Sequence, residues 1–587
     1  MPSQLVGKRY IHSCPYRDPK RQLEVIAVKE HLVYKEEDGR YTAKPNLRFI
    51  KNPPRRFWVT KPQYQIYNEN KEWEKMEWLD EYVVENQHMA SEVYKVLNGY
   101  YPKGYVNLRD VNKSPYVYGT DMSIDALIVG KYIRDYKKTN LPMTALSNGF
   151  YDIETSMVDD RIIMATVTHN NQVYTAILKD YLFKKDKSGK KIPATLEELS
   201  ALSQKVFSEF KIKTKKSNKT VLEHGFTFEY HVASTEIDLV KWIFSKIHEN
   251  KTDFIGAWNM KFDVGRTMDA CKRANVDPGE IFCSPEVPED IRVCRLVLDT
   301  NKKVPHWSRK WDWLHCTSHS QFYDALQLYS RQRIVDGFET SYGLDYILKK
   351  NINIGKLKFP DLIDPDTLSP ADWHRYMQEN HPLEYCVYNQ FDGISIQIME
   401  IQNQDATGMS ILGTNTFTPL SNYNKQTRRN ANEFYFICLD RGYVTGSTPQ
   451  IDENVSEDDL FRQLSIQGGA VLPTMMVHNV GMRCLTERPD FETKACRNVN
   501  DVDYKALYPT LCIILNTSRE TNLSTLVRLS GYTPKETQNF LSMVISTREN
   551  SVPIATQFLN LPGYEELDID FMKEFNITEK EEDLEIA

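Results

Sequence analysis

Two carboxylates spaced two residues apart in an apolar segment constrain this chain more than any other feature. The segment is Phe150-Tyr151-Asp152-Ile153-Glu154-Thr155. Read as a strand, it places Asp152 and Glu154 on one face, because residues two apart on a strand point the same way. Two negative charges so close are costly without a cation between them, and oxygen ligands suit hard divalent ions such as Mg²⁺ or Mn²⁺. The segment therefore predicts part of a metal site, or else a pair of solvent-facing strand residues.

A second acidic segment combines an apolar strand, a turn and the start of a helix. It runs from Asp253 to Asp263, and Asn259 lies four residues before Asp263. Residues four apart on a helix share a face, so Asn259 and Asp263 are expected on the same side. The competing interpretation is an asparagine that caps the helix, followed by a surface aspartate.

A third segment, from Glu384 to Asp392, reads as a helix that carries Tyr388 and Asp392 four residues apart. A phenol and a carboxylate on one helix face can position a water molecule beside a metal ion. The alternative is an ordinary helix with a half-buried tyrosine.

In this order, the three segments resemble the exonuclease motifs of the DnaQ-like, or RNase H-like, proofreading fold. That resemblance implies hydrolysis of DNA phosphodiesters at two Mg²⁺ or Mn²⁺ ions. Tyr388 would orient the attacking water, and Asn259 and Phe262 would contact the DNA strand. Asp324, a further acid in a segment similar to the family, would support the site from outside or cap a helix. The implied metal ligands are Asp152, Glu154, Asp263 and Asp392.

Residues 502–521, VDYKALYPTLCIILNTSRET, resemble motif A of family B DNA polymerases. Residues 467–471 resemble the Gly-Gly motif that joins the exonuclease and polymerase modules, and Ser341-Tyr342-Gly343-Leu344 also has a family counterpart. Over about residues 110–525 the chain is similar to the replicative polymerases of large tailed bacteriophages. This implies a mixed α/β, multidomain chain with an α+β N-terminal domain, a DnaQ-like exonuclease domain and an incomplete palm.

The resemblance also assigns roles within the palm segment. Asp503 would bind both catalytic metal ions of the polymerase site, and the carbonyl of Tyr504 would be a second oxygen ligand. Tyr508 would lie under the sugar of the incoming dNTP and exclude a 2′-hydroxyl by steric collision. Leu507, beside it, would shape the same turn and belong to the dNTP-binding site.

Two polymerase motifs do not occur in the sequence, namely K-x-x-x-N-S-x-Y-G of motif B and D-T-D of motif C. We therefore expect an N-terminal half of a split polymerase, completed by a second chain, with a truncated sequence as the alternative. The apolar segments 511–515 and 558–561 would then lie in an interface of more than about 2,000 Å². Other expected partners are a DNA primer-template, a single-stranded 3′ end, a sliding clamp and other replisome proteins. A stand-alone repair exonuclease and a non-enzymatic replisome scaffold are the competing functions.

Composition narrows the class of protein. Hydrophobic residues make up 41% and charged residues 26% of the 587 residues, as in ordinary globular chains. No apolar run approaches the roughly 18 residues of a membrane span, so no membrane role is expected. Ten cysteines contain no C-x-x-C pair, which favours reduced thiols in a cytoplasm, the host's if the chain is phage-encoded. The net charge of −7 stems from residues 565–587, with ten acids and two bases.

Five regions are expected along the chain. Within the expected exonuclease domain (148–400), residues 184–222 form a lysine-rich insertion that either contacts phosphates or stays solvated and flexible. Residues 304–313 interleave tryptophans with basic residues, and either stack on the bases of a frayed 3′ end or pack as a loop. The regions are an N-terminal domain (1–147), an exonuclease domain (148–400), connecting helices with the Gly-Gly linker (401–472), a partial palm (473–563) and an acidic tail (564–587).

Local patterns predict several elements around these motifs. Strands are expected at Gln22–Val28 and Arg56–Thr60, and a hairpin is expected from residues 161–169 and 173–178 around Asn170-Asn171. A helix is expected over residues 235–248, capped by Thr235.

Overall fold

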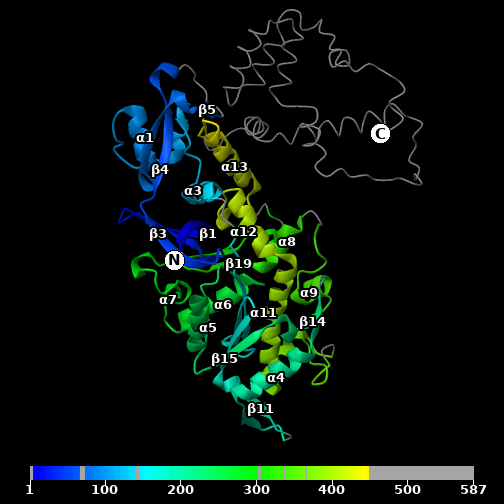
Figure 1. The fold of residues 1–587 in the computed structure, drawn as a ribbon. Coiled ribbons are helices and arrows are strands. Elements are labelled where there is room, and N and C mark those ends of the chain that lie inside the picture. The colour runs from blue at the N-terminus through cyan, green and yellow to red at the C-terminus, as the bar shows by residue number, and fades with distance from the viewer. Residues whose placement is uncertain are drawn as a thin grey trace, which may run out of the picture. The chain divides into compact units, whose positions relative to one another are not determined.

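The computed structural model describes residues 4–65, 73–139, 144–186, 188–215, 217–301, 304, 306–334, 337–364 and 367–447. Over these residues the chain is a mixed α/β protein with several sheets, one of them with eight strands (Figure 1). The Gly-Gly motif at 467–471, the segment at 502–521 and the acidic tail lie outside the described residues. The expectations placed on them stay predictions.

The chain divides into two compact units. Of the described residues, the first comprises those within 4–54, 85–87 and 122–436, and the second comprises those within 55–84, 88–121 and 437–447. The expected boundary at residue 147 falls inside the first unit, and the domain boundaries expected from the sequence stay predictions. All residues of the candidate site that the structure describes belong to the first unit.

The second unit is built on a three-stranded sheet in the order β6-β4-β7 and a two-stranded sheet of β20 and β5. Phe57 and Val59 of β4 pack against Val93 of α1 in its core. The strand expected at Arg56–Thr60 is confirmed. The elements are β4 (Pro54–Thr60), β5 (Trp73–Lys75), β6 (Leu79–Glu85), α1 (Met89–Asn98), α2 (Leu108–Val111), β7 (Val117–Tyr118) and β20 (Tyr443–Thr445).

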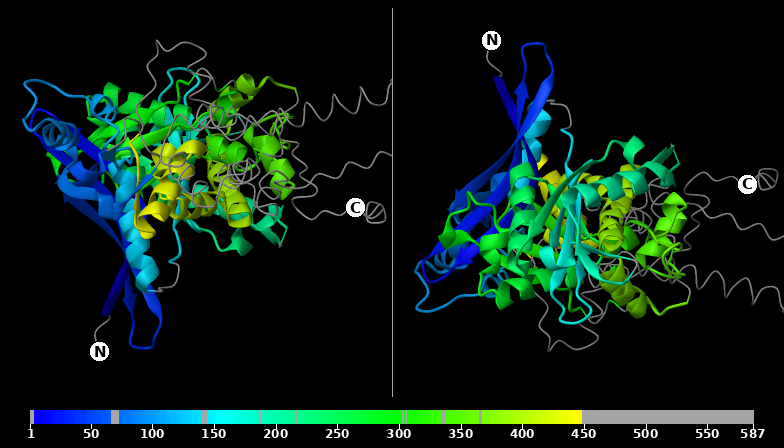
Figure 2. Two further views of the ribbon diagram at one scale, coloured as in Figure 1. Left: turned by 90° about the horizontal axis from the view of Figure 1, so that it is seen from above. Right: turned by 90° about the horizontal axis from the view of Figure 1, so that it is seen from below.

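The first unit begins with an antiparallel sheet of three long strands, β1 (Gln4–Asp18), β2 (Leu23–Lys35) and β3 (Tyr41–Lys51). Figure 2 shows these strands in blue as a long, twisted ribbon. The helix α3 (Ile124–Thr139) packs on β1. The strand expected at Gln22–Val28 is confirmed as the first half of β2.

An eight-stranded mixed sheet forms the centre of the first unit, in the order β15-β10-β9-β8-β16-β19-β18-β17. The expected hairpin is confirmed, because β9 and β10 pair antiparallel on either side of a turn with Asn170 at φ 51°. β16 pairs parallel to both β8 and β19. The strands are β8 (Asn148–Thr155), β9 (Ile162–His169), β10 (Gln172–Leu178), β15 (Thr227–Ala233), β16 (Phe254–Ala257), β17 (Cys294–Val297), β18 (Trp313–Cys316) and β19 (Gln321–Asp324).

Helices cover this sheet. The helix expected at residues 235–248 is confirmed as α5, with the Thr235 hydroxyl accepting from the Asp238 amide at 3.2 Å. The helices that follow β15 are α5 (Glu236–Asn250), α6 (Met260–Arg273), α7 (Pro278–Phe282), α8 (Ala325–Gln332), α9 (Leu344–Ile352), α10 (Pro370–Asn380), α11 (Pro382–Asn403), α12 (Asp405–Asn415) and α13 (Gln426–Asp440).

Alternate residues of β8 and β9 serve opposite faces of the sheet. On one face Tyr151 of β8 packs against Phe244 of α5, with 5.9 Å between ring centroids. On the other face Thr166 of β9 donates to Asn389 of α11 at 2.7 Å. Figure 1 shows α5 and α11 on either side of these strands. The two carboxylates of β8 have the opposite parity to Tyr151, so they face α11.

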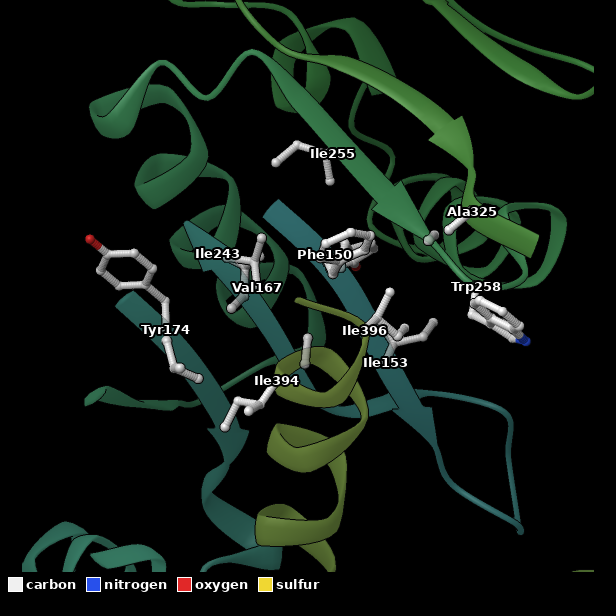
Figure 3. Packing of buried hydrophobic residues seen from close by; sticks show 14 of the residues in the cluster. Phe150, Ile153, Val167, Tyr174, Ile243, Ile255, Trp258, Ala325, Ile394 and Ile396 are labelled. Carbon is white, nitrogen blue, oxygen red and sulfur yellow. The ribbon is translucent and has the colours of Figure 1, made fainter. Parts of the chain in front are cut away.

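The core of the first unit fixes the relative positions of β8, β9 and α11. Figure 3 shows Val167 near Ile243 of α5, with Ile394 of α11 in the same cluster. Gly149 permits the close approach of β8 and β9, because a β-carbon there would lie 2.1 Å from the Thr168 carbonyl oxygen.

The lysine-rich region at 184–222 is folded where the structure describes it. It contains two short hairpins around α4 (Leu196–Glu209), which has a capping box of Thr195 and Glu198 and buries Phe207. The interpretation as a flexible insertion is therefore wrong for these residues, because buried apolar side chains anchor the helix to the main core. The hairpin strands are β11 (Phe183–Lys185), β12 (Lys191–Pro193), β13 (Lys211–Lys213) and β14 (Asn218–Thr220).

Candidate metal centre

Three of the predicted acids converge on one point between β8 and α11. Carboxylate oxygens of Asp152, Glu154 and Asp392 all lie within 4.8 Å of one another. Asp152 and Glu154 come from β8, as the alternation of the strand predicts, and Asp392 comes from the middle of α11. Residues from a strand and a helix more than 200 positions apart thus meet at one cluster, which we call the carboxylate trio.

Ionising the carboxylates of the trio in these positions costs free energy. Burial is the main cause that raises the pKa of Asp152 well above its usual range, followed by the charges of Asp392, Asp263 and Glu154. Burial also raises the pKa of Glu154 to about 7, although Lys356 and Tyr385 oppose the shift. Mutual repulsion of this kind is relieved when a cation binds between the carboxylates.

Asp263 belongs to the same electrostatic environment but not to the trio. It lies in the first turn of α6, and the Asn259 side chain caps that helix by accepting from the Phe262 amide at 3.4 Å. Asp263 is buried, so the interpretation as a surface aspartate is wrong. Its pKa is raised well above the usual range by burial and then by the charges of Glu154 and Asp324. The capping role considered for Asn259 is confirmed.

Two side chains of α11 orient the trio. Asn389 donates to Oδ2 of Asp152 at 2.6 Å, and its own carbonyl oxygen accepts from Thr166 at 2.7 Å. The Tyr385 hydroxyl donates to Oε2 of Glu154. Each carboxylate of β8 is therefore held from α11 by one neutral donor.

A lysine supplies the positive charge beside the trio. Nζ of Lys356, which follows α9, lies 2.5 Å from Oδ2 of Asp392 and 2.7 Å from the hydroxyl oxygen of Tyr388. Burial alone would lower the pKa of Lys356, but the neighbouring charges, Asp392 foremost, raise it well above its usual range. The other oxygen of Asp392, Oδ1, is buried and has no hydrogen-bond partner.

Tyr388 and Asp324 have definite positions. Tyr388 is buried on α11, and its hydroxyl accepts from Lys356, so its predicted role toward water stays a prediction.

Asp324 caps α8 by accepting from the Gln327 amide at 2.8 Å, and it also accepts from the Met260 amide at 3.1 Å. The capping role expected for Asp324 is confirmed, and the same side chain ties the start of α6 to the start of α8.

The predicted site residues therefore separate into two sets. The structure brings together the acids of β8 and α11, and the charge of Asp263 is close enough to help raise the pKa of Asp152. Phe262 is 39% exposed at the start of α6. The residues predicted for the polymerase site lie outside the described residues, namely Asp503, Tyr504, Leu507 and Tyr508.

Sequence reasoning missed Lys356, Tyr385 and Asn389. Tyr385 stands one helical turn before Tyr388, so the periodicity of α11 could have placed it on the same side. Asn389 lies four residues after Tyr385 and three before Asp392, so the same periodicity places it on that side, whereas Lys356 lies in an irregular segment after α9, to which no period applies.

Comparison with known proteins adds no assignment, since no protein-family model matches the chain and no curated protein is similar to it. Within the part of the chain that the structure describes, every helix is too short or too polar to cross a membrane.

Proposed function

We propose that the first unit is a metal-dependent 3′→5′ exodeoxyribonuclease of the DnaQ-like type that proofreads newly made DNA. The observation that carries this proposal is the carboxylate trio, with oxygens within 4.8 Å, on the face of a mixed sheet. Its order of motifs along the chain, with Asp263 between those of β8 and α11, supports the same class of enzyme.

The residues fit divalent cations. All donors are hard oxygen atoms, and such ligands suit Mg²⁺ or Mn²⁺. Among the described residues, the four acids outnumber Lys356, the lysine paired with Asp392, and Oδ1 of Asp392 is buried without a hydrogen-bond partner. Asp152, Glu154, Asp263 and Asp392 would hold the metal. Two bound ions would activate water and stabilise the leaving oxygen of a phosphodiester.

The chain's own residues would orient the reacting groups. Asn389 and Tyr385 each fix one carboxylate oxygen, which limits the directions in which the remaining lone pairs point. Lys356 holds Asp392 and Tyr388 together, and its positive charge beside the trio would favour the approach of a phosphate. The exposed ring of Phe262 offers a face on which a terminal base can stack.

The test is a nuclease assay with the purified full chain. We expect a 5′-labelled single-stranded DNA to shorten stepwise from its 3′ end with Mg²⁺ or Mn²⁺ and to stay intact in EDTA. The double variant Asp152→Asn, Glu154→Gln should lower the rate about a thousandfold, since several kcal/mol of metal-dependent stabilisation is lost. The matched control is Asp269→Asn, an acid of α6 paired with Lys272 at the surface. An unchanged rate in the double variant would refute the site.

We also propose a part in template-directed DNA synthesis, favoured by the motif-A-like segment at 502–521. Asp503 and the Tyr504 carbonyl would bind metal ions, and Tyr508 with Leu507 would contact the dNTP. Residues that this sequence does not contain, those of motifs B and C, would have to complete that site. In a mixture with a chain carrying them, Asp503→Asn should abolish nucleotide incorporation and leave the exonuclease rate unchanged. Incorporation that survives Asp503→Asn would refute this role.

A further inference from the structure

The exposed rings of Trp307 and Phe338 lie beside His306 and Tyr342, and Tyr342 is buried at the edge of the main core of the first unit. We call the group His306, Trp307, Arg309, Phe338 and Tyr342 the aromatic surface. Trp307 and Phe338 are 54% and 56% exposed. The His306 ring joins the others, with centroids 5.6 Å from Trp307, 4.9 Å from Phe338 and 5.7 Å from Tyr342. Adjacent exposed rings of this size mark a binding surface more often than isolated ones do.

The aromatic surface rests on a hydrogen-bonded base. Nδ1 of His306 lies 2.7 Å from the Ser308 hydroxyl, which lies 3.1 Å from the hydroxyl of Ser330 in α8. Ser330 in turn donates to the Tyr342 hydroxyl at 3.1 Å. Because Ser308 and Ser330 are buried, the rings are held in place before any ligand arrives. A partner that stacks on them loses little free energy to ordering.

Positive charge accompanies the exposed rings. The Arg309 guanidinium carbon lies 4.0 Å from the Phe338 ring centroid, and its NH2 donates to the Gly337 carbonyl at 3.3 Å. Neither Arg309 nor Lys310 forms an ion pair with any carboxylate in the described part of the chain. Exposed rings next to uncompensated basic groups are complementary to the bases and phosphates of single-stranded nucleic acid.

The aromatic surface is attached to the elements that build the candidate metal centre. Nε1 of Trp258 donates to the Tyr342 carbonyl at 3.1 Å. Figure 3 shows the Trp258 ring at the end of β16, and the next residue, Asn259, caps the helix that carries Asp263. On the other side, Tyr342 leads into α9 and then to Lys356. The two segments that deliver Asp263 and Lys356 to the site are thus both joined to Tyr342.

We propose that the aromatic surface binds the single-stranded DNA whose 3′ end enters the carboxylate trio, with bases stacked on Trp307 and Phe338 and a phosphate at Arg309. This inference rests on the proposed exonuclease function and names where its substrate strand lies. It also assigns different residues of the tryptophan-rich segment 304–313 to the two interpretations that the sequence left open, namely stacking on bases and packing as a loop. Trp311 is buried and packs, whereas Trp307 is presented to solvent.

The binding test uses the full chain in EDTA, where no cleavage occurs, and a labelled oligo-dT of about 12 nucleotides. Trp307→Ala and Phe338→Ala should each weaken binding roughly tenfold, since one stacked base contributes about 1–3 kcal/mol. Trp307→Tyr should restore most of the affinity. Tyr105→Ala, an aromatic residue that is 95% exposed in the second unit, is the control and should change nothing.

Abasic DNA separates stacking from phosphate contact. An oligonucleotide of the same length with abasic sugars should bind the wild type weakly, and Trp307→Ala should cause no further loss. Equal losses with both oligonucleotides would overturn the stacking proposal, and so would unchanged oligo-dT binding by the Trp307→Ala, Phe338→Ala double variant. If Trp307 is shielded from a soluble quencher in the free full chain, its ring is covered by protein and is not open to DNA. That result would also overturn the proposal.

The two proposals fail in different ways. If Asp152→Asn, Glu154→Gln leaves cleavage unchanged while the ring variants lose oligo-dT binding, the exonuclease site is wrong and the DNA surface stands. If cleavage depends on the trio but binding ignores the rings, the DNA surface is wrong.

Discussion

At the scale of single residues, one lysine balances a group of acids. Lys356 contacts Asp392 and Tyr388, and in the described part of the chain it is the one lysine or arginine paired with the trio. A buried charge that loses its partner is strongly destabilising, whereas a bound metal can take over the partner's role. The ammonium of Lys356 therefore compensates the buried charge of Asp392 in the folded state.

We predict that Lys356→Met lowers the free energy of unfolding by about 3 kcal/mol in EDTA, because Asp392 loses its counter-charge. Millimolar Mg²⁺ should raise the melting temperature of this variant more than that of the wild type. The comparison is made by thermal unfolding with and without the metal, and Lys349→Met, whose partner Asp345 is at the surface, is the control. A smaller metal response in Lys356→Met than in the wild type would contradict the prediction.

At the scale of elements, the close pairing of β8 and β9 sets the position of the trio. Gly149 lies in β8, where any β-carbon would overlap the backbone of Thr168, whereas Gly265 of α6 has open space around it. We predict that Gly149→Ala lowers the free energy of unfolding by about 3 kcal/mol and reduces the proposed exonuclease activity, because β8 must shift. Gly265→Ala should raise stability by about 0.5–1 kcal/mol, as expected for a helical glycine. Both are measured by urea unfolding, and a tolerated Gly149→Ala would show that β8 can move freely.

The junction between α11 and α12 carries a pH-dependent contribution. Glu400 accepts from the amides of Ala406 and Thr407, yet burial raises its pKa to about 7. Its folded pKa is above the unfolded value, so the folded state binds more protons and stability falls as pH rises from about 4.5 to 7. Glu400→Gln has no carboxylate to ionise at this position. Its free energy of unfolding minus that of the wild type should therefore be about 3 kcal/mol higher at pH 8 than at pH 5. Urea unfolding at the two pH values measures the difference, which should be absent in Glu209→Gln, at the exposed end of α4.

The elements differ in how far their sequence determined them. The alternation in β8, the turn at Asn170-Asn171 and the cap at Thr235 are local signals, so the strand, the hairpin and α5 follow from them. The meeting of β8 with α11 does not follow from any local period, and it was inferred from a resemblance between motifs. Lys356 escaped notice because its position depends on where the chain returns after α9, which only the packed fold decides.

At the scale of the whole molecule, a metal ion should act on one unit alone. Ligands that bind only the folded state stabilise it, by about 2.7 kcal/mol at a hundred times the dissociation constant. We predict that Mg²⁺ raises the unfolding temperature of the first unit, which contains the trio, and leaves the second unit unchanged. Scanning calorimetry in Mg²⁺ and in EDTA tests this, and Asp152→Asn, Glu154→Gln should abolish the shift. A shift that persists in the double variant would place the metal elsewhere.

One helix, α11, carries several side chains of the candidate metal centre. Tyr385, Tyr388, Asn389 and Asp392 all sit on α11, whose residues are buried from Pro382 nearly to Glu400. Because the helix is enclosed on all sides, one of these side chains cannot move while the other three keep their positions. A shift or rotation of α11 would therefore move all four side chains together, so a substitution that changes how this helix packs would alter the geometry of the whole candidate metal centre.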